Sequence, residues 1–305
     1  MAYFCLELYI FFNKTFVDSA YISLQISRRE KLYELLIVSY TRMKNSTSVT
    51  MFTQTRKYRI GGYRPGKKSE DAKIHHTDRF DSDRLPPKVD LRKYMTEVEE
   101  QVGNSCVANA FVGAYEYLAQ RDLGESGDVS RLFVYYNARS LNGNEQEDRG
   151  TQMELAIKAL TDYGACCEDI WPNDEELIFQ EPDSSAYEHA ANFKIEEAEF
   201  IETDLDLWKH TLAEGYPIAF ALNTFESFDD ATRNRGRVPL PKKSDNVRST
   251  HGWHAMLCVG YSDKDRVFIV RNSWGSEWGD KPGTACASRS RILLHPLQLC
   301  HPSGV

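Results

Sequence analysis

The sequence lacks a long hydrophobic run. No stretch of its 305 residues reaches the roughly 20 apolar residues that a membrane-spanning helix requires, so we expect no membrane association. The first residues, MAYFCLELYIFF, form a short apolar run. Glu7 interrupts it, no basic residue precedes it, and no clear cleavage site follows. These features argue against a signal peptide and favour an intracellular protein.

The sequence also lacks an excess of basic residues. It carries 45 acidic and 37 basic side chains, which gives a formal net charge of −8. A mildly acidic surface argues against nucleic acid or an anionic lipid surface as the main partner. With 41% hydrophobic and 27% charged residues, the composition is ordinary for a globular protein of one large domain or two small ones.

Cysteine is present, but without the patterns of a disulfide-rich or zinc-binding protein. The seven cysteines form an odd, scattered set, and no CxxC pair occurs. We therefore expect a protein in a reducing compartment, with no metal and no cofactor. The cysteines are Cys5, Cys106, Cys166, Cys167, Cys258, Cys286 and Cys300.

The chain divides into three regions. Residues 1–84 are heterogeneous, and we interpret them as a partly disordered N-terminal extension with one possible helix over Ser27–Met43. Its polar stretch with Gly61, Gly62, Pro65 and Gly66 is typical of a loop. A double proline at Pro86-Pro87 marks the start of the main domain, which we place at 85–281. Residues 282–305 form an atypical tail without a clear period.

In the main domain, helical patterns come first and strand patterns later. Three segments carry apolar residues at helical spacing, and three short apolar runs bounded by Gly, Asn and Asp are typical of strands. The predicted helices are 106–122, 151–163 with Gly164 as its C-terminal stop, and 206–214. The predicted strands are 217–222, 255–261 and 267–271, with a long surface loop over 224–250. This order predicts an α+β fold with a helical half at about 100–200 and a β half at about 200–281.

Cys106 begins the strongest predicted helix, after a Gly-Asn-Ser turn. Exposed N–H groups and the macrodipole at a helix start stabilise an anion, so a thiol there ionises more easily and becomes a better nucleophile. The alternative is a small buried cysteine, which is the commoner fate of this residue type.

His254 and Asn272 suit a supporting role for such a thiol. His254 precedes the apolar run 255–261, and an imidazole held at a strand start can take the thiol's proton. Asn272 follows the predicted strand 267–271, and its amide oxygen can fix the orientation and tautomer of an imidazole. Each residue alone also fits a structural role. The order Cys, His, Asn, with His254 placed 148 residues after Cys106, is typical of papain-type enzymes.

Four segments together resemble the papain-like cysteine peptidases, in a disulfide-poor, bacterial-type branch of the family. The resemblance covers roughly 85–281 and implies a mainly helical half and a β-barrel half with an active-site cleft between them. The segments are VDLR at 89–92, QVGNSCVANAF at 101–111, GWHA at 252–255 with VGY at 259–261, and RNSWGSEWG at 271–279.

The resemblance implies a role for each matching residue. Cys106 would be the nucleophile, His254 the general base and Asn272 the orienting group. Gln101 would donate its side-chain amide to the oxyanion hole. Three further residues would contact the substrate: Gly150, Thr151 and Trp274. The family resemblance implies a peptide or protein substrate, and we expect a monomer.

The sequence departs from the family pattern in several places. The bridging cysteine before the nucleophile is absent, and Gln101 lies one position closer to Cys106 than is common in the family. The N-terminal region lacks the long helical propeptide signature of the family, so the sequence does not support inhibition in trans by that segment. The tail from Pro282 does not resemble the family's closing strand, and we expect an exposed sheet edge there.

Two other functions remain open at this stage. A shortened oxyanion loop or an unstable β half would leave an inactive homologue that acts as a binding or regulatory protein. A metal site made by His251, His254 and Cys258 is a further alternative. It is disfavoured because residues three apart on a strand point to opposite faces.

Overall fold

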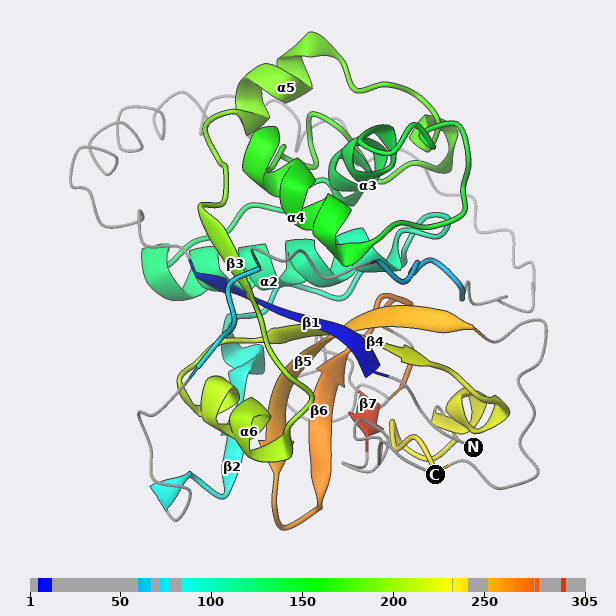
Figure 1. The fold of residues 1–305 in the computed structure, drawn as a ribbon. Helices are drawn as coiled ribbons and strands as arrows, with labels where there is room; N and C mark the ends of the chain where they lie inside the picture. Colours follow the sequence, from blue (N-terminus) through cyan, green and yellow to red (C-terminus); the bar gives the residue numbers. More distant parts are fainter. Residues whose placement is uncertain are drawn as a thin grey trace, which may run out of the picture. The chain divides into compact units, whose positions relative to one another are not determined.

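A computed structural model describes residues 5–12, 60–66, 72–76, 84–231, 233–240, 252–276, 278–279 and 292–294, with only the backbone at 5–12 and 292–294 (Figure 1). The helix predicted over Ser27–Met43 lies outside the described residues, as do residues 241–251, which include His251.

One long helix, α2 (Cys106–Leu123), is the central element of the fold. Its first fourteen residues are all buried, because it contacts α3 and α4 on one side and strands β4 and β5 on the other (Figure 1). It ends at Gly124, which adopts a left-handed conformation with φ 77°. The other helices of this half are α3 (Arg131–Ser140), α4 (Met153–Asp162) and α5 (Ser184–Ala190).

The structure confirms the three predicted helices within a few residues: α2, α4 with Gly164 in a left-handed conformation (φ 95°), and α6 (Leu205–Ala213). Short 3₁₀ helices lie at Leu91–Tyr94, Glu175–Leu177 and Glu226–Ala231. The last of these falls in the predicted surface loop and buries Phe228 and Ala231, so this part of the loop belongs to the core.

The β half is an antiparallel sheet, and all three predicted strands belong to it. Among the described residues, the hydrogen-bonded order is β3-β1-β4-β5-β6-β7, and β2 also pairs with β5. The strands are β1 (Cys5–Phe12), β2 (Lys88–Asp90), β3 (Glu197–Phe200), β4 (Ile218–Asn223), β5 (Trp253–Ser262), β6 (Val267–Arg271) and β7 (Ile292–Leu294). No described helix is long and apolar enough to cross a membrane.

Both terminal regions contribute strands to the sheet. The apolar N-terminal run forms β1, which pairs with β3 and β4. Residues 72–76 also attach to this region, since Phe200 donates its N–H to Lys73 O at 2.8 Å and His75 donates its N–H to Phe200 O at 2.7 Å. In the tail, β7 pairs with β6 through Ile269↔Leu293. The expectation that the β6 edge is exposed was therefore wrong, because a tail segment supplies the ladder partner.

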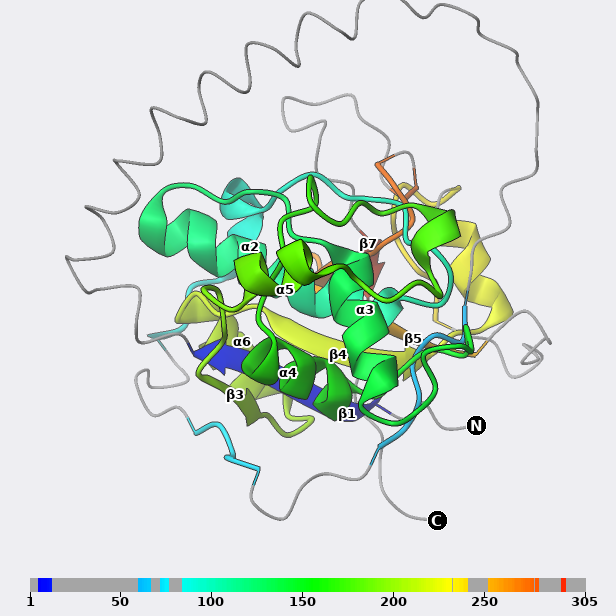
Figure 2. The same ribbon diagram turned by 90° about the horizontal axis from the view of Figure 1, so that it is seen from above.

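The strand register places the predicted site at the junction between the two halves. His254 is the second residue of β5 and pairs with Leu222 of β4. Asn272 directly follows β6, the other neighbour of β5. Helix α2 begins with Cys106 and packs along β5. Seen from above, helices α3, α4 and α5 lie on the near side of strands β1 and β4 (Figure 2).

Candidate active site

The Cys106 thiol is fully buried at the first residue of α2. Its sulfur accepts the backbone N–H of Ala255 at 3.4 Å, so it lies beside the strand start that carries His254. Burial raises the pKa of the thiol to about 12, although the backbone N–H groups of Ala255, Val107, Cys106 and Gly62 each lower it. In this buried state the thiol is protonated.

The His254 imidazole is held by Asn272. His254 Nε2 and Asn272 Oδ1 are 2.7 Å apart, and Ser273 donates its backbone N–H to the same oxygen at 2.8 Å. Because a backbone N–H needs an acceptor, that atom of Asn272 is the oxygen and His254 Nε2 carries the hydrogen. His254 Nδ1 is then the basic nitrogen, and it has no hydrogen-bond partner among the described residues.

Burial also sets the charge state of the imidazole. His254 is 0% exposed, and desolvation lowers its pKa to about 4 even though the hydrogen bond to Asn272 raises it. The thiol and the imidazole are therefore both neutral in this structure.

Aromatic side chains cover the pair formed by His254 and Asn272. Trp274 stacks on the imidazole, with ring centroids 4.9 Å apart and planes inclined by 25°. Trp278 and Phe228 pack against Trp274 at centroid distances of 4.6 and 5.7 Å. Trp274 is 2% exposed, so it shields the hydrogen bond from water, and its contact with substrate stays a prediction.

Gln101 is fixed by three hydrogen bonds. It donates its backbone N–H to Ser273 O at 2.8 Å, and its Oε1 accepts the Ser273 hydroxyl at 2.6 Å. Its Nε2 donates to Gly103 O at 3.0 Å. Gly103 has φ 57°, a conformation that suits glycine and closes the short loop before Cys106. One amide hydrogen of Gln101 is thus used inside the loop, and the predicted donation of the second to an oxyanion stays a prediction.

Of the predicted substrate-binding residues, Thr151 is hydrogen-bonded to an extended segment of the same chain. We call residues 60–66 the covering segment. Thr151 donates its N–H to Gly62 O at 2.9 Å, and Arg64 donates its N–H to Thr151 O at 2.9 Å, which forms a parallel bridge. On the sheet side, Gly61 donates to Trp253 O at 3.1 Å. The covering segment therefore spans from the helical half to the β half.

The covering segment closes directly over the thiol. A Cβ at Gly62 would stand 2.8 Å from Cys106 Sγ and would also collide with the Asn104 carbonyl, so only glycine fits there. Tyr63 is 2% exposed, and its ring meets that of Trp253 edge-on at 5.9 Å. Gly150 permits this approach because a Cβ on it would collide with Gly62 O.

A hydrogen-bond network centred on Asp148 supports the two loops that meet at the covering segment. Asp148 Oδ1 accepts the Asn104 N–H at 2.8 Å and the Tyr135 hydroxyl at 2.8 Å. The Tyr135 oxygen in turn accepts the Gly150 N–H at 3.0 Å. Sequence analysis did not single out Asp148 or Tyr135, because neither belongs to a local motif.

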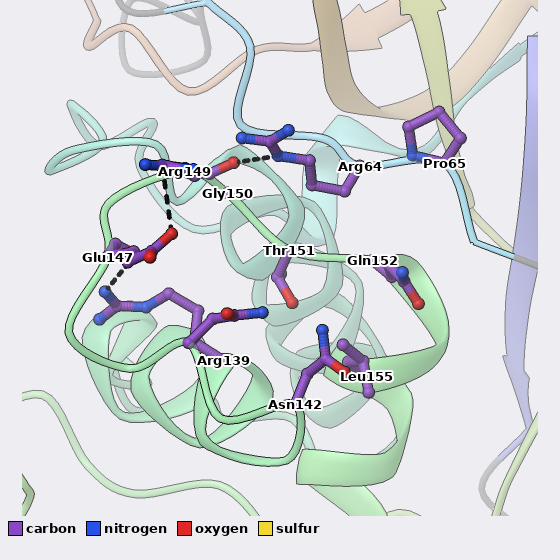
Figure 3. A pocket seen from close by; sticks show the side chains of 11 residues that line it. Arg64, Pro65, Arg139, Asn142, Glu147, Arg149, Gly150, Thr151, Gln152 and Leu155 are labelled. Carbon is purple, nitrogen blue, oxygen red and sulfur yellow. Dashed lines mark hydrogen bonds and ion pairs between the residues drawn. The ribbon is translucent and has the colours of Figure 1, made fainter.

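A polar pocket of about 410 Å³ lies where the covering segment leaves Thr151 (Figure 3). Arg64 and Pro65 of the segment form one side, and Arg64 Nε donates to Arg149 O at 2.5 Å. Arg149 is paired with Glu147 at 3.1 Å on the rim. Side-chain amides and a buried arginine complete the pocket, which suits a polar side chain.

The structure brings together Cys106, His254, Asn272 and Trp274, with Gln101 attached to the Asn272 loop through Ser273. Of the proposed metal ligands, His251 is outside the described residues. In the described part of the chain, no three His, Cys, Asp or Glu side chains are grouped as a metal site requires. Besides Asp148 and Tyr135, the sequence did not indicate the covering segment as part of the site. Its glycines gave a turn signal but no sign of its partner.

Comparison with known proteins identifies the family of the chain. The family model described as "Papain family cysteine protease" matches residues 85–291. An uncharacterized peptidase C1-like protein of Acanthamoeba polyphaga mimivirus is 36% identical over 217 residues, covering 64% of this chain and 68% of that protein.

The chain is also similar to two proteins with specific names, a cathepsin and a bacterial cysteine protease. Cathepsin K of Gallus gallus is 28% identical over 214 residues, covering 66% of this chain and 58% of that protein. The crystal structure of xylellain, a cysteine protease from Xylella fastidiosa, superimposes with a TM-score of 0.68 at 30% identity, over 81% of this chain and 94% of that one. The chain therefore belongs to the papain family of cysteine proteases.

Proposed function

We propose that the protein is a cysteine peptidase that hydrolyses peptide bonds through Cys106, His254 and Asn272, and that its own covering segment keeps it inactive. The observation that carries the proposal is that the Cys106 sulfur accepts the backbone N–H of Ala255, the residue after His254, whose imidazole is hydrogen-bonded to Asn272. Asn272 occupies His254 Nε2, which leaves the lone pair on Nδ1 as the base for the Cys106 proton.

The reaction follows from these groups. The Cys106 proton moves to His254 Nδ1, and the thiolate attacks the scissile carbonyl carbon to form a C–S bond. His254 returns that proton to the leaving amine as the C–N bond breaks, which leaves an acyl-enzyme thioester. Water then adds to the thioester while His254 takes its proton, and the thiol leaves as the carboxylic acid forms.

The developing oxyanion has two candidate donors at this site. The backbone N–H of Cys106 lies at the start of α2, where N–H groups lack a partner inside the helix. The second amide hydrogen of Gln101 is the other donor, and the bond to Gly103 O restrains its position. A donor of this kind contributes on the order of 10²–10³ in turnover.

The covering segment blocks this reaction in two ways. Gly62 presents its backbone N–H to the sulfur, whereas attack requires a carbonyl carbon at that position. Burial beneath the segment also disfavours the thiolate–imidazolium pair, since desolvation favours the neutral forms of Cys106 and His254.

Substrates would replace the covering segment. An extended peptide can bond to the N–H and C=O of Thr151, which the segment now occupies, and can bond to Trp253 O as Gly61 does. The substrate class is therefore an extended stretch of a peptide or protein chain.

The proposal is tested by peptide hydrolysis with the full chain. Tyr63→Ala removes the buried ring that anchors the covering segment, and we expect hydrolysis to rise well above that of the wild type. Adding Cys106→Ala to this variant should abolish hydrolysis. Persistent hydrolysis without Cys106 would contradict the proposal. A folded Tyr63→Ala protein with an accessible thiol but no hydrolysis of a mixed peptide library would favour an inactive homologue.

A further inference from the structure

A small cavity lies beside Asn272. It has a volume of about 10 Å³ and is bordered by Glu99, Asn109, Arg271, Asn272 and Ser273. The Glu99 backbone is tied to the loop that follows Asn272, because Gly275 donates its N–H to Glu99 O at 2.9 Å. Glu99 thus belongs to the frame that holds the orienting asparagine.

Two residues that line this cavity, Asn272 and Glu99, each have a buried polar atom without a partner among the described residues. Asn272 uses Oδ1 for both of its hydrogen bonds, and its Nδ2 has no partner. Glu99 uses Oε1 for an ion pair with Arg131 at 2.8 Å, and its Oε2 has none. Leaving such groups unpaired is costly, and a volume of roughly 10–15 Å³ holds one water molecule.

We propose that Glu99 is a positioning residue for the active site and acts on Asn272 through a single water molecule in this cavity. The water accepts a hydrogen bond from Asn272 Nδ2 and donates one to Glu99 Oε2. A carboxylate at the end of this chain polarises the Asn272 amide, so Oδ1 becomes a better acceptor for the His254 imidazolium. The inference rests on the proposed peptidase function for its catalytic consequence.

The charges around Glu99 place this effect in the neutral pH range. Burial raises the pKa of Glu99 to about 7, Arg131 lowers it, and the nearby carboxylates of Glu168, Glu116 and Asp128 raise it. Arg271 borders the cavity from the end of β6. Glu99 therefore becomes negative as the pH rises through about 7, and the negative form favours imidazolium over neutral imidazole.

The test compares Glu99→Gln with Glu168→Gln, both in the Tyr63→Ala background that exposes the thiol. Burial raises the pKa of Glu168 to about 7 as well, and Glu168 faces the same Arg131, but it does not border the cavity. The pH dependence of iodoacetamide alkylation at Cys106 is measured for each. We expect Glu99→Gln to move the alkaline limb, where the imidazolium is lost, down by about 0.5–1 pH unit. Glu168→Gln should leave it in place. Equal profiles for both variants would overturn the inference.

A crystal structure of the wild-type chain gives a readout that does not depend on activity. We expect a water molecule within about 3.2 Å of both Asn272 Nδ2 and Glu99 Oε2. A dry cavity would overturn the inference even if the protein is an active peptidase. If Cys106 proves unreactive in every variant while the water is present, the peptidase proposal fails and the positioning contact stands.

Discussion

The covering segment should leave the thiol when a single methyl group is added to Gly62. A Cβ at this position would lie 2.8 Å from Cys106 Sγ and would collide with the backbone oxygen of Asn104. Real Cβ contacts are not this short. Cys106 begins α2, and Asn104 is held by two hydrogen bonds to Asp148, so we expect the segment to move. Gly62 does not have a positive φ, so the effect of Gly62→Ala is steric rather than conformational.

The size of the effect follows from overpacking. Forcing a methyl group into a filled site costs about 1–3 kcal/mol, which corresponds to about a 5-fold to 150-fold rise in the open population. Because alkylation of a buried thiol proceeds from the open form, the rate of Cys106 alkylation by iodoacetamide should rise by the same factor. The rate is read by mass spectrometry of the Cys106 peptide.

Gly252→Ala is the matched control for this experiment. A Cβ at Gly252 would contact Gly61 Cα at 3.7 Å, an ordinary van der Waals distance, so this variant adds the same methyl group beside the same segment without a clash. It should be alkylated at the wild-type rate. Equal rates for Gly62→Ala, Gly252→Ala and the wild type would refute the claim that the covering segment seals the thiol.

Three further changes have defined outcomes. Tyr63→Ala removes a side chain that is 2% exposed. Because loss of a buried aromatic ring costs about 3–5 kcal/mol, Cys106 alkylation should become at least about 100-fold faster. Alkylation at the wild-type rate would show that the ring does not anchor the covering segment. Gly150→Ala places a Cβ where the backbone of a bound peptide would lie and strains a residue with φ 81°. KM for peptides should therefore rise about tenfold or more, with a smaller change in kcat. An unchanged KM would remove Gly150 from the substrate site. Burial raises the pKa of Glu168 from 4.5 to about 7, so the folded chain keeps this proton to a higher pH than the unfolded chain and loses stability as the pH rises from about 4.5 to 7. Glu168→Gln should therefore raise the free energy of unfolding in urea by about 1–2 kcal/mol at pH 8 and change it little at pH 4, whereas a uniform loss at both pH values would contradict this reasoning.

The predicted catalytic residues were readable because each sits at a change of local structure. Cys106 follows a turn and begins a helix, His254 lies at the start of a strand, and Asn272 follows one. A few neighbouring residues are enough to indicate where a helix or a strand begins or ends, so these positions can be predicted from the sequence. The contact between His254 and Asn272 also follows from their two strands being paired neighbours, which the short apolar runs indicate.

The covering segment could not be predicted because its structure comes from distant partners. Gly61 and Gly62 indicate a loop, but the need for glycine at position 62 is set by Asn104 and Cys106, which lie more than forty positions further along the chain. The ladder with Thr151 is likewise non-local. A sequence pattern of period two or 3.6 carries no information about such a pairing.

Helix α3 was missed for a different reason. It is buried nearly all round, so its apolar residues do not form a stripe. Two of its buried residues are arginines: Arg131 pairs with Glu116 at 2.9 Å, and Arg139 donates to backbone carbonyls such as Glu147 O at 3.0 Å. Charged residues suggest an exposed segment when only the sequence is read, and the partners that neutralise them lie on other elements.

The proposed function requires that Cys106 and His254 form a reactive pair once the covering segment is displaced. This is tested by labelling the Tyr63→Ala chain with an epoxide inhibitor that reacts only with activated thiols. We expect one label per chain at Cys106, absent from Cys106→Ala and strongly slowed by His254→Ala. Alkylation of the folded protein at Cys106 by iodoacetamide without labelling by the epoxide, or equally fast labelling of His254→Ala, would contradict a reactive pair.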